Sequence, residues 1–157
     1  MEPLSEPELR TAFEGHSKDV FVPDLTKVEW HALDYFGWIH PGGNLGYIVL
    51  VSPLDGQLKG TLLRRSRLSN NHPGFELCSL CHHVHRPNGT AMFTASYSDE
   101  GKLHSVGNVV CKNLDCSLRI RNILEPESCM NETLYVEAKV WRMQLALHKW
   151  LKAANCL

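Results

Sequence analysis

Two short stretches decide the fold of this chain: Cys78-Ser79-Leu80-Cys81 and Cys111-Lys112-Asn113-Leu114-Asp115-Cys116. The residues between the two cysteine pairs have the pattern of a β-hairpin. A structural zinc ion takes four thiolates in a tetrahedron, and proteins usually supply them as two local pairs. The sequence therefore predicts one structural zinc ion, although the C-x4-C spacing of the second pair is wider than the commonest finger spacing. The expected ligands are Cys78, Cys81, Cys111 and Cys116.

Three histidines, His82, His83 and His85, directly follow the first pair. Whether one of them replaces a cysteine ligand stays open. We interpret them as surface residues or as donors of a hydrogen bond to a sulfur ligand. Four thiolates leave no open position for a metal-bound water, so the pattern argues against a catalytic zinc. A redox role for the first cysteine pair is a weaker alternative, since it needs a reactive thiol that binds no metal.

Composition favours one cytoplasmic domain. The chain has 157 residues, of which 43% are apolar and 21% are charged, and this length suits a single domain with a real core. No stretch approaches the roughly 20 apolar residues of a membrane-spanning helix, and the acidic start lacks the apolar run of a secretory signal. Paired cysteines in the cytoplasm are more often metal ligands than disulfides. The net charge of −1 provides no overall attraction to nucleic acid or to membranes.

Residues 1–70 are expected to form a portion of helices and a β-hairpin. Ser5-Glu6-Pro7-Glu8 has the pattern of a capping box and predicts a helix over 6–13. A similar pattern at Thr26 predicts a second helix that ends near Gly37. Two strands, over 46–51 and 57–65, should pair across a turn. A polar loop over 66–76 follows.

Residues 76–122 are expected to form a zinc-binding portion in the order knuckle, hairpin and short helix, which is the order of a treble-clef finger. A long helix over 131–153 should follow, with Asn131 as its N-cap. Its expected apolar face consists of Leu134, Val140, Trp141, Leu145, Leu147 and Leu151. All four tryptophans are interpreted as core residues or as members of a hydrophobic staple at a helix start. The predicted fold class is thus α+β, in one domain over 1–157, with the treble clef packed against the N-terminal portion and the C-terminal helix.

The densest part of the chain resembles a known family. The stretches over 78–89, 105–111 and 113–121 resemble the C-terminal treble-clef domain of elongation factor G-binding proteins, the relatives of FusB-type fusidic acid resistance proteins. The opening Met1-Glu2-Pro3-Leu4 and the segment over 33–38 resemble short bacterial members. The resemblance implies a cytoplasmic zinc protein that binds elongation factor G on the ribosome and helps to release it. FusB-type proteins carry a helical bundle ahead of this domain, for which this chain has no room, so fusidic acid resistance stays open.

The zinc should also prepare a surface for a partner, because side chains on a metal-fixed knuckle lose little entropy on docking. The expected contact residues are Ser79, Leu80, Arg86, Lys102, His104, Arg119 and Arg121. For Arg119 and Arg121, a merely solvated surface is an equal alternative. The second function considered is an RNA- or ribosome-binding zinc finger. No nucleophile–base pair or phosphate loop is evident in the sequence, so we expect a protein that is not an enzyme.

Overall fold

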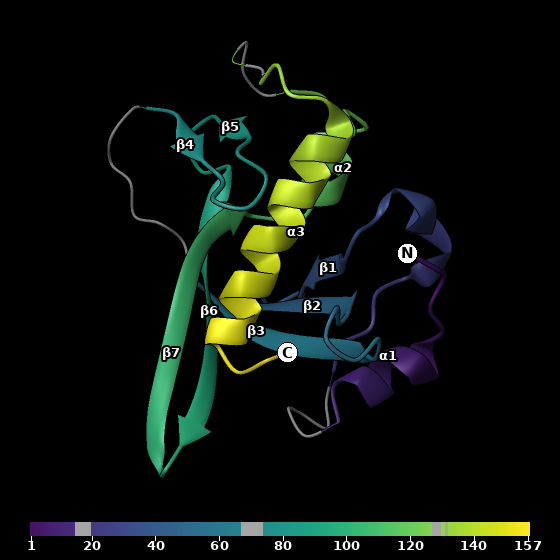
Figure 1. Ribbon diagram of the computed structural model, residues 1–157, viewed down its shortest axis with the longest axis vertical. Coiled ribbons are helices and arrows are strands. Elements are labelled where there is room, and N and C mark those ends of the chain that lie inside the picture. Colours follow the sequence, from purple (N-terminus) through teal and green to yellow (C-terminus); the bar gives the residue numbers. More distant parts are fainter. Residues whose placement is uncertain (15–19, 67–73, 127–129, 131) are drawn as a thin grey trace.

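The computed structural model describes residues 1–14, 20–66, 74–126, 130 and 132–157 (Figure 1). Helices and strands are mixed, in agreement with the α+β prediction. In chain order they are α1 (Glu6–Ala12), η1 (Leu25–Lys27), η2 (Trp30–Ala32), β1 (Phe36–Ile39), β2 (Leu45–Val51), β3 (Leu58–Ser66), β4 (Glu76–Leu77), β5 (Val84–His85), β6 (Thr90–Asp99), β7 (Lys102–Cys111), α2 (Cys116–Ile120) and α3 (Val136–Ala153).

The centre of the fold is a five-stranded antiparallel sheet in the order β1-β2-β3-β6-β7. Figure 1 shows α3 lying across one face of this sheet, with β4, β5 and α2 near its N-terminal end. The β4–β5 pair forms a separate two-stranded sheet. The hairpin of β6 and β7 extends well beyond the rest of the sheet.

Both faces of the sheet are covered, and β2 shows how. Ile48 and Leu50 point to one core cluster, and Tyr47 and Val49 point to the other. The first cluster fills the space under α3 and contains the four paired cysteines, and the second packs against α1 and the N-terminal segment. Because β2 is buried on both faces, its sequence is a nearly continuous apolar run. Membership of the first cluster makes the four cysteines part of the main core.

The first predicted helix is confirmed. Ser5 and Glu8 make both bonds of the capping box at the start of α1, and Leu9 is fully buried. Helix α1 approaches β3 closely at Gly60, where an added Cβ would lie 2.7 Å from the carbonyl oxygen of Ala12. Only a residue without a side chain allows this contact.

The second predicted helix is wrong. The segment from Thr26 to Gly37 forms two 3-10 turns and then enters β1. Asp24, not Thr26, caps the first turn, because its side chain accepts a hydrogen bond from the Thr26 amide at 3.1 Å. Gly37 does not cap a helix. A Cβ there would lie 2.6 Å from the Cβ of Leu114, so this glycine lets β1 pass close to the loop between the second pair of cysteines.

The long helix is confirmed, but it begins at Val136 with Tyr135 as its N-cap. Asn131, Cys129 and the loop segment over 67–73 lie outside the described residues. The predicted apolar face is wrong in part: Met143, Leu147, Trp150 and Leu151 are buried, whereas Leu134, Trp141 and Leu145 are exposed. Apolar residues occur on both sides of this helix, and helical spacing alone does not tell which side meets the sheet. Among the described helices, none combines the length and apolar character needed to cross a bilayer.

Candidate metal centre

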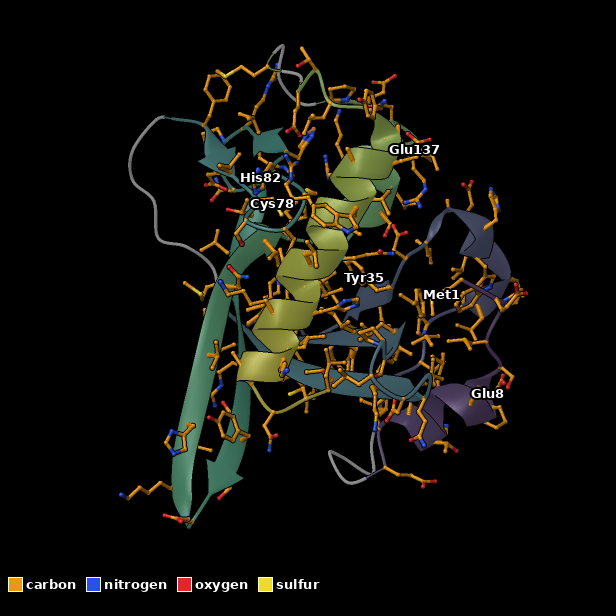
Figure 2. The ribbon with its side chains drawn as sticks, viewed as in Figure 1. Met1, Glu8, Tyr35, Cys78, His82 and Glu137 are labelled. Carbon is orange, nitrogen blue, oxygen red and sulfur yellow. The ribbon has the colours of Figure 1, made fainter. Side chains whose placement is uncertain are left out.

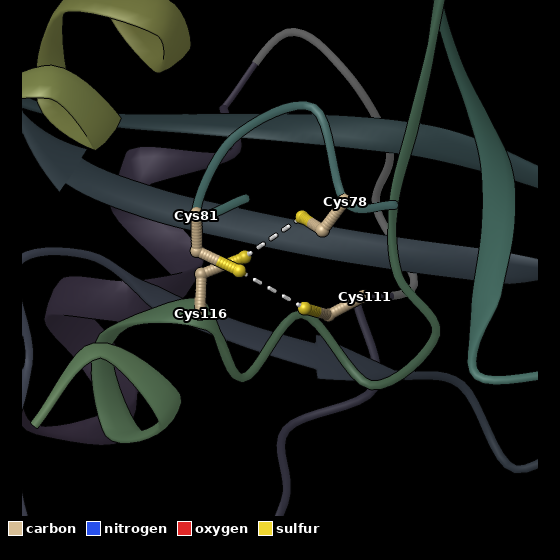
Figure 3. Close-up of side chains that lie close together, drawn as sticks. All are labelled: Cys78, Cys81, Cys111 and Cys116. Atoms are coloured by element: carbon tan, nitrogen blue, oxygen red, sulfur yellow. Dashed lines mark hydrogen bonds between the residues drawn. The ribbon is translucent and has the colours of Figure 1, made fainter. Parts of the chain in front are cut away.

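The four paired cysteines converge on one point (Figure 3). Cys78 follows β4, Cys81 ends the knuckle, Cys111 ends β7 and Cys116 begins α2. Their sulfur atoms all lie within 4.8 Å of one another and are buried. The Sγ–Sγ distance is 3.7 Å between Cys78 and Cys116 and 3.4 Å between Cys81 and Cys111.

These distances fit a tetrahedral thiolate site. Zinc–sulfur bonds of about 2.3 Å place the sulfur atoms of a regular tetrahedron about 3.8 Å apart. A disulfide would need roughly 2.05 Å, so neither measured sulfur pair is bonded. The four cysteines are positioned to bind one metal ion, and an all-sulfur donor set suits zinc. When bound, the metal would cross-link the knuckle, the end of β7 and the start of α2.

The backbone holds both cysteine pairs. In the knuckle, the His82 amide donates to the Cys78 carbonyl at 2.9 Å, and the Ser79 amide donates to the Val109 carbonyl of β7 at 2.9 Å. The wider second spacing is explained by a turn. Leu114 has a φ of 59°, and its amide donates to the Cys111 carbonyl at 2.9 Å. The extra residues thus reverse the chain before α2 begins with Cys116.

His85 lies against the sulfur cluster. Its ring is fully buried, and its Nε2 lies 3.2 Å from the Sγ of Cys111. A metal-bound thiolate can only accept a hydrogen bond, so Nε2 is the donor in the loaded site. Gly89 makes room for this ring, because a Cβ at Gly89 would collide with His85. The position of His85 matches the interpretation of a hydrogen-bond donor to sulfur.

The pKa values of the clustered cysteines depend on one another. Contact with the Cys116 sulfur, followed by contacts with Cys78 and Cys81, raises the pKa of Cys111 well above its usual value. Burial opposes ionisation of Cys78, but hydrogen bonds from the other three thiols hold its pKa well below the usual value. Burial also raises the pKa of Tyr35, and charge on Cys116 adds to the rise. The ionisation of each thiol is thus tied to the sulfur atoms around it.

Two of the predicted contact residues, Arg119 and Arg121, form ion pairs within the chain. Arg119 donates to Asp115 at 2.9 Å, and both side chains are almost wholly buried. Arg121 makes two bonds to Asp34, at 2.6 and 2.9 Å, across 87 positions of sequence. Neither arginine is a solvated surface residue. Leu80 is fully buried as well, so it offers no surface to a partner.

The remaining predicted contact residues do not form one patch. Ser79 is half-buried beside the metal site, and Arg86 is exposed just after β5. Lys102 and His104 are exposed near the far end of the β6–β7 hairpin. Lys102 and Cys111 are the two ends of β7, and their nine-residue separation corresponds to about 30 Å of strand. In Figure 1, β7 runs from the neighbourhood of β4 and β5 to the far end of the β6–β7 hairpin.

Two exposed residues beside the knuckle were missed from the sequence. Phe75 and Leu77 are 58% and 55% exposed, while Glu76 between them is buried. The alternation of Phe75-Glu76-Leu77 was the available signal, since successive strand residues point to opposite faces. Glu76 faces inward, where it accepts hydrogen bonds from the Asn88 and Thr90 amides at 2.9 and 2.8 Å.

The fold and the cysteine cluster define a treble-clef zinc-finger protein. The model of the family described as the FBP C-terminal treble-clef zinc-finger matches residues 8–153, and the chain belongs to this family. A solved structure titled "Structure of the fusidic acid resistance protein FusC" is similar to it with a TM-score of 0.62 and 17% sequence identity. That match covers 97% of this chain and 59% of the FusC chain. The likeness to FusC is one of fold, and this chain spans under two thirds of its length. No curated protein sequence matches.

Proposed function

We propose that this chain is a non-enzymatic protein that binds elongation factor G. The observation that carries the proposal is the family match over residues 8–153. It agrees with the resemblance of the cysteine-containing stretches to elongation factor G-binding proteins, and the likeness to FusC supports the same assignment. Elongation factor G works on the ribosome, so the proposal implies a cytoplasmic and ribosome-associated protein.

The contact surface we favour is the outer face of the β4–β5 pair. The register pairs Leu77 with Val84 and Glu76 with His85. Continued by one residue, it places Phe75 opposite Arg86. Phe75, Leu77 and Arg86 are all exposed. Their inward neighbours, Glu76 and His85, are buried.

This face has the composition and the rigidity of a binding surface. An aromatic side chain, an aliphatic side chain and an arginine resemble the centre of a protein interface. The cysteine knuckle is the loop that joins β4 to β5, so a bound zinc fixes both strands. A preorganised surface loses little conformational entropy when a partner docks. Binding at this face is therefore expected to depend on the metal.

Calorimetric titration of purified elongation factor G with zinc-loaded protein tests the proposal. We expect saturable binding that weakens at least tenfold, equivalent to about 1.4 kcal/mol, in the double variant Leu77→Ala, Arg86→Ala. The matched control is Leu103→Ala, which removes a side chain 76% exposed at the far end of the β6–β7 hairpin. Unchanged affinity in the double variant would place the interface on another face. No binding by the wild-type protein would refute the proposed function.

The same titration separates a protein partner from RNA. Binding to RNA weakens steeply with salt because phosphate contacts release counterions, whereas an interface with an apolar centre is less sensitive. A steep salt dependence with ribosomal RNA, combined with no binding to elongation factor G, would favour the RNA-binding alternative. Release of elongation factor G in the presence of fusidic acid is a further step of the proposal, measured as restored turnover on purified ribosomes.

A further inference from the structure

Helix α3 carries an apolar stripe on its outer face. Trp141 and Leu145 are 65% and 49% exposed, although the opposite side of the helix is packed into the core. Large apolar side chains that stand together in solvent often mark an interaction site. Figure 1 shows α3 in front of the sheet, and none of the labelled elements covers its outer face in that view.

The stripe ends in opposite charges. Glu137 and Lys149 are exposed and stand four residues before Trp141 and four residues after Leu145. Residues four apart lie on the same side of a helix. Figure 2 places Glu137 at the N-terminal end of α3. The outer face therefore runs from a negative end, through two large apolar side chains, to a positive end.

We propose that this face binds the same face of a second copy of the chain, with the two α3 helices antiparallel. If the two-fold axis passes midway between Trp141 and Leu145, each tryptophan lies against Leu145 of the second copy. Glu137 and Lys149 are equally far from that axis, so each glutamate meets a lysine of the second copy. The pairing needs no other partner, because one stripe supplies both complementary halves, as in any isologous interface.

The next residues on the face also match. Ala138 and His148 both lie three positions outside the central pair and are half-buried, so the two-fold axis brings a small side chain opposite a large ring. Rows of residues spaced by four interdigitate at about −50° in the commonest class of helix packing.

The contact is small for an interface between two proteins. One helix per copy buries less than the roughly 1,200–2,000 Å² of a standard interface. We therefore expect a reversible dimer with a dissociation constant on the order of 10–100 μM. The net charge of −1 adds little repulsion between copies. This inference is independent of the proposed function, since the β4–β5 face is not part of the stripe.

Sedimentation equilibrium of the zinc-loaded full chain in reducing buffer, between about 5 and 500 μM, tests the inference. We expect a monomer–dimer equilibrium in the wild-type protein. Glu137→Lys and Lys149→Glu should each weaken the dimer at least tenfold, because each places like charges opposite one another. An equimolar mixture of the two variants should dimerise again, and so should the double variant that carries both changes.

Two controls are needed: a substitution at an exposed residue outside the stripe, and a check that every variant keeps its fold and its zinc. Leu103→Glu, at the hairpin end, should leave the dimer unchanged, whereas Trp141→Ala should weaken it. Circular dichroism and zinc content should match the wild-type protein in every variant, since all these side chains are exposed. A protein that stays monomeric over the whole range overturns the proposal. So does a dimer that neither charge change weakens, or a mixture that fails to recover.

Discussion

The ion pair between Asp34 and Arg121 is the strongest single test of how the N-terminal segment is attached. Arg121 lies just after α2, and Asp34 lies just before β1. Two hydrogen bonds of 2.6 and 2.9 Å join them. The Asp34 side chain is only 8% exposed and that of Arg121 is 24% exposed. The Asp34 carboxylate also raises the pKa of Arg121 above its usual value. We consider the substitutions Asp34→Asn and Arg121→Met.

Breaking the pair leaves one buried charge without its partner. A fully buried pair costs roughly 3–5 kcal/mol when one member is removed. Because Arg121 is partly exposed, solvent compensates some of this loss, and we expect about 2–3 kcal/mol for either substitution. That corresponds to a fall in melting temperature of about 4–12 °C for a domain of this size. The double variant should lose little more than either single variant, since no orphan charge remains.

Urea unfolding of the wild-type protein, the two single variants and the double variant measures this coupling as a double-mutant cycle. Zinc content is checked in each protein. The control is Arg10→Met in the half-exposed pair of Arg10 with Glu6, which should cost less than about 1 kcal/mol. If the effects of Asp34→Asn and Arg121→Met simply add, the two groups do not act together. A loss below about 1 kcal/mol for each substitution, which is what an exposed pair contributes, would refute the claim that this pair is largely shielded from solvent.

Three further outcomes are expected. Wild-type protein should contain one zinc by elemental analysis, and Cys111→Ser should contain little and unfold at much lower temperature, because zinc binding contributes directly to folding. His85→Phe, which removes the donor 3.2 Å from the Cys111 sulfur, should lower zinc affinity about tenfold or more in chelator competition. Glu132→Gln should cost about 1 kcal/mol at pH 7. A hydrogen bond from Arg142 holds the pKa of Glu132 below its usual value, so this cost is full above about pH 4.3 and shrinks as the pH falls below it. A cost that is the same at low and neutral pH would contradict that account.

The parts predicted correctly are those set by local sequence. The two cysteine pairs carry their geometry in their spacing, and the capping box at Ser5 signals the start of α1 directly. The strands on either side of the turn at 53–56 follow from β-favouring residues and the turn residues between them. In each case the deciding interactions join residues close in the chain.

The parts predicted wrongly depend on distant contacts. Arg121 was read as a surface residue because its partner, Asp34, is 87 positions away. Gly37 was read as a helix cap, although the close approach of Leu114 explains it. Trp141 and Trp150 both lie in α3, and the sequence does not show which side of this helix faces the sheet. The structure buries Trp150 and leaves Trp141 exposed. The pairing of Arg119 with Asp115 was within reach of the sequence, since oppositely charged residues four apart commonly pair on helices.

Binding of elongation factor G before and after zinc removal is the measurement that tests the central claim most directly. The titrations use the zinc-loaded protein, the same protein after complete chelation, and the chelated protein after zinc is restored. The account expects saturable binding in the first, a loss of at least tenfold in the second and full recovery in the third. Absence of binding by the zinc-loaded protein, or equal binding after verified removal of the metal, would contradict it.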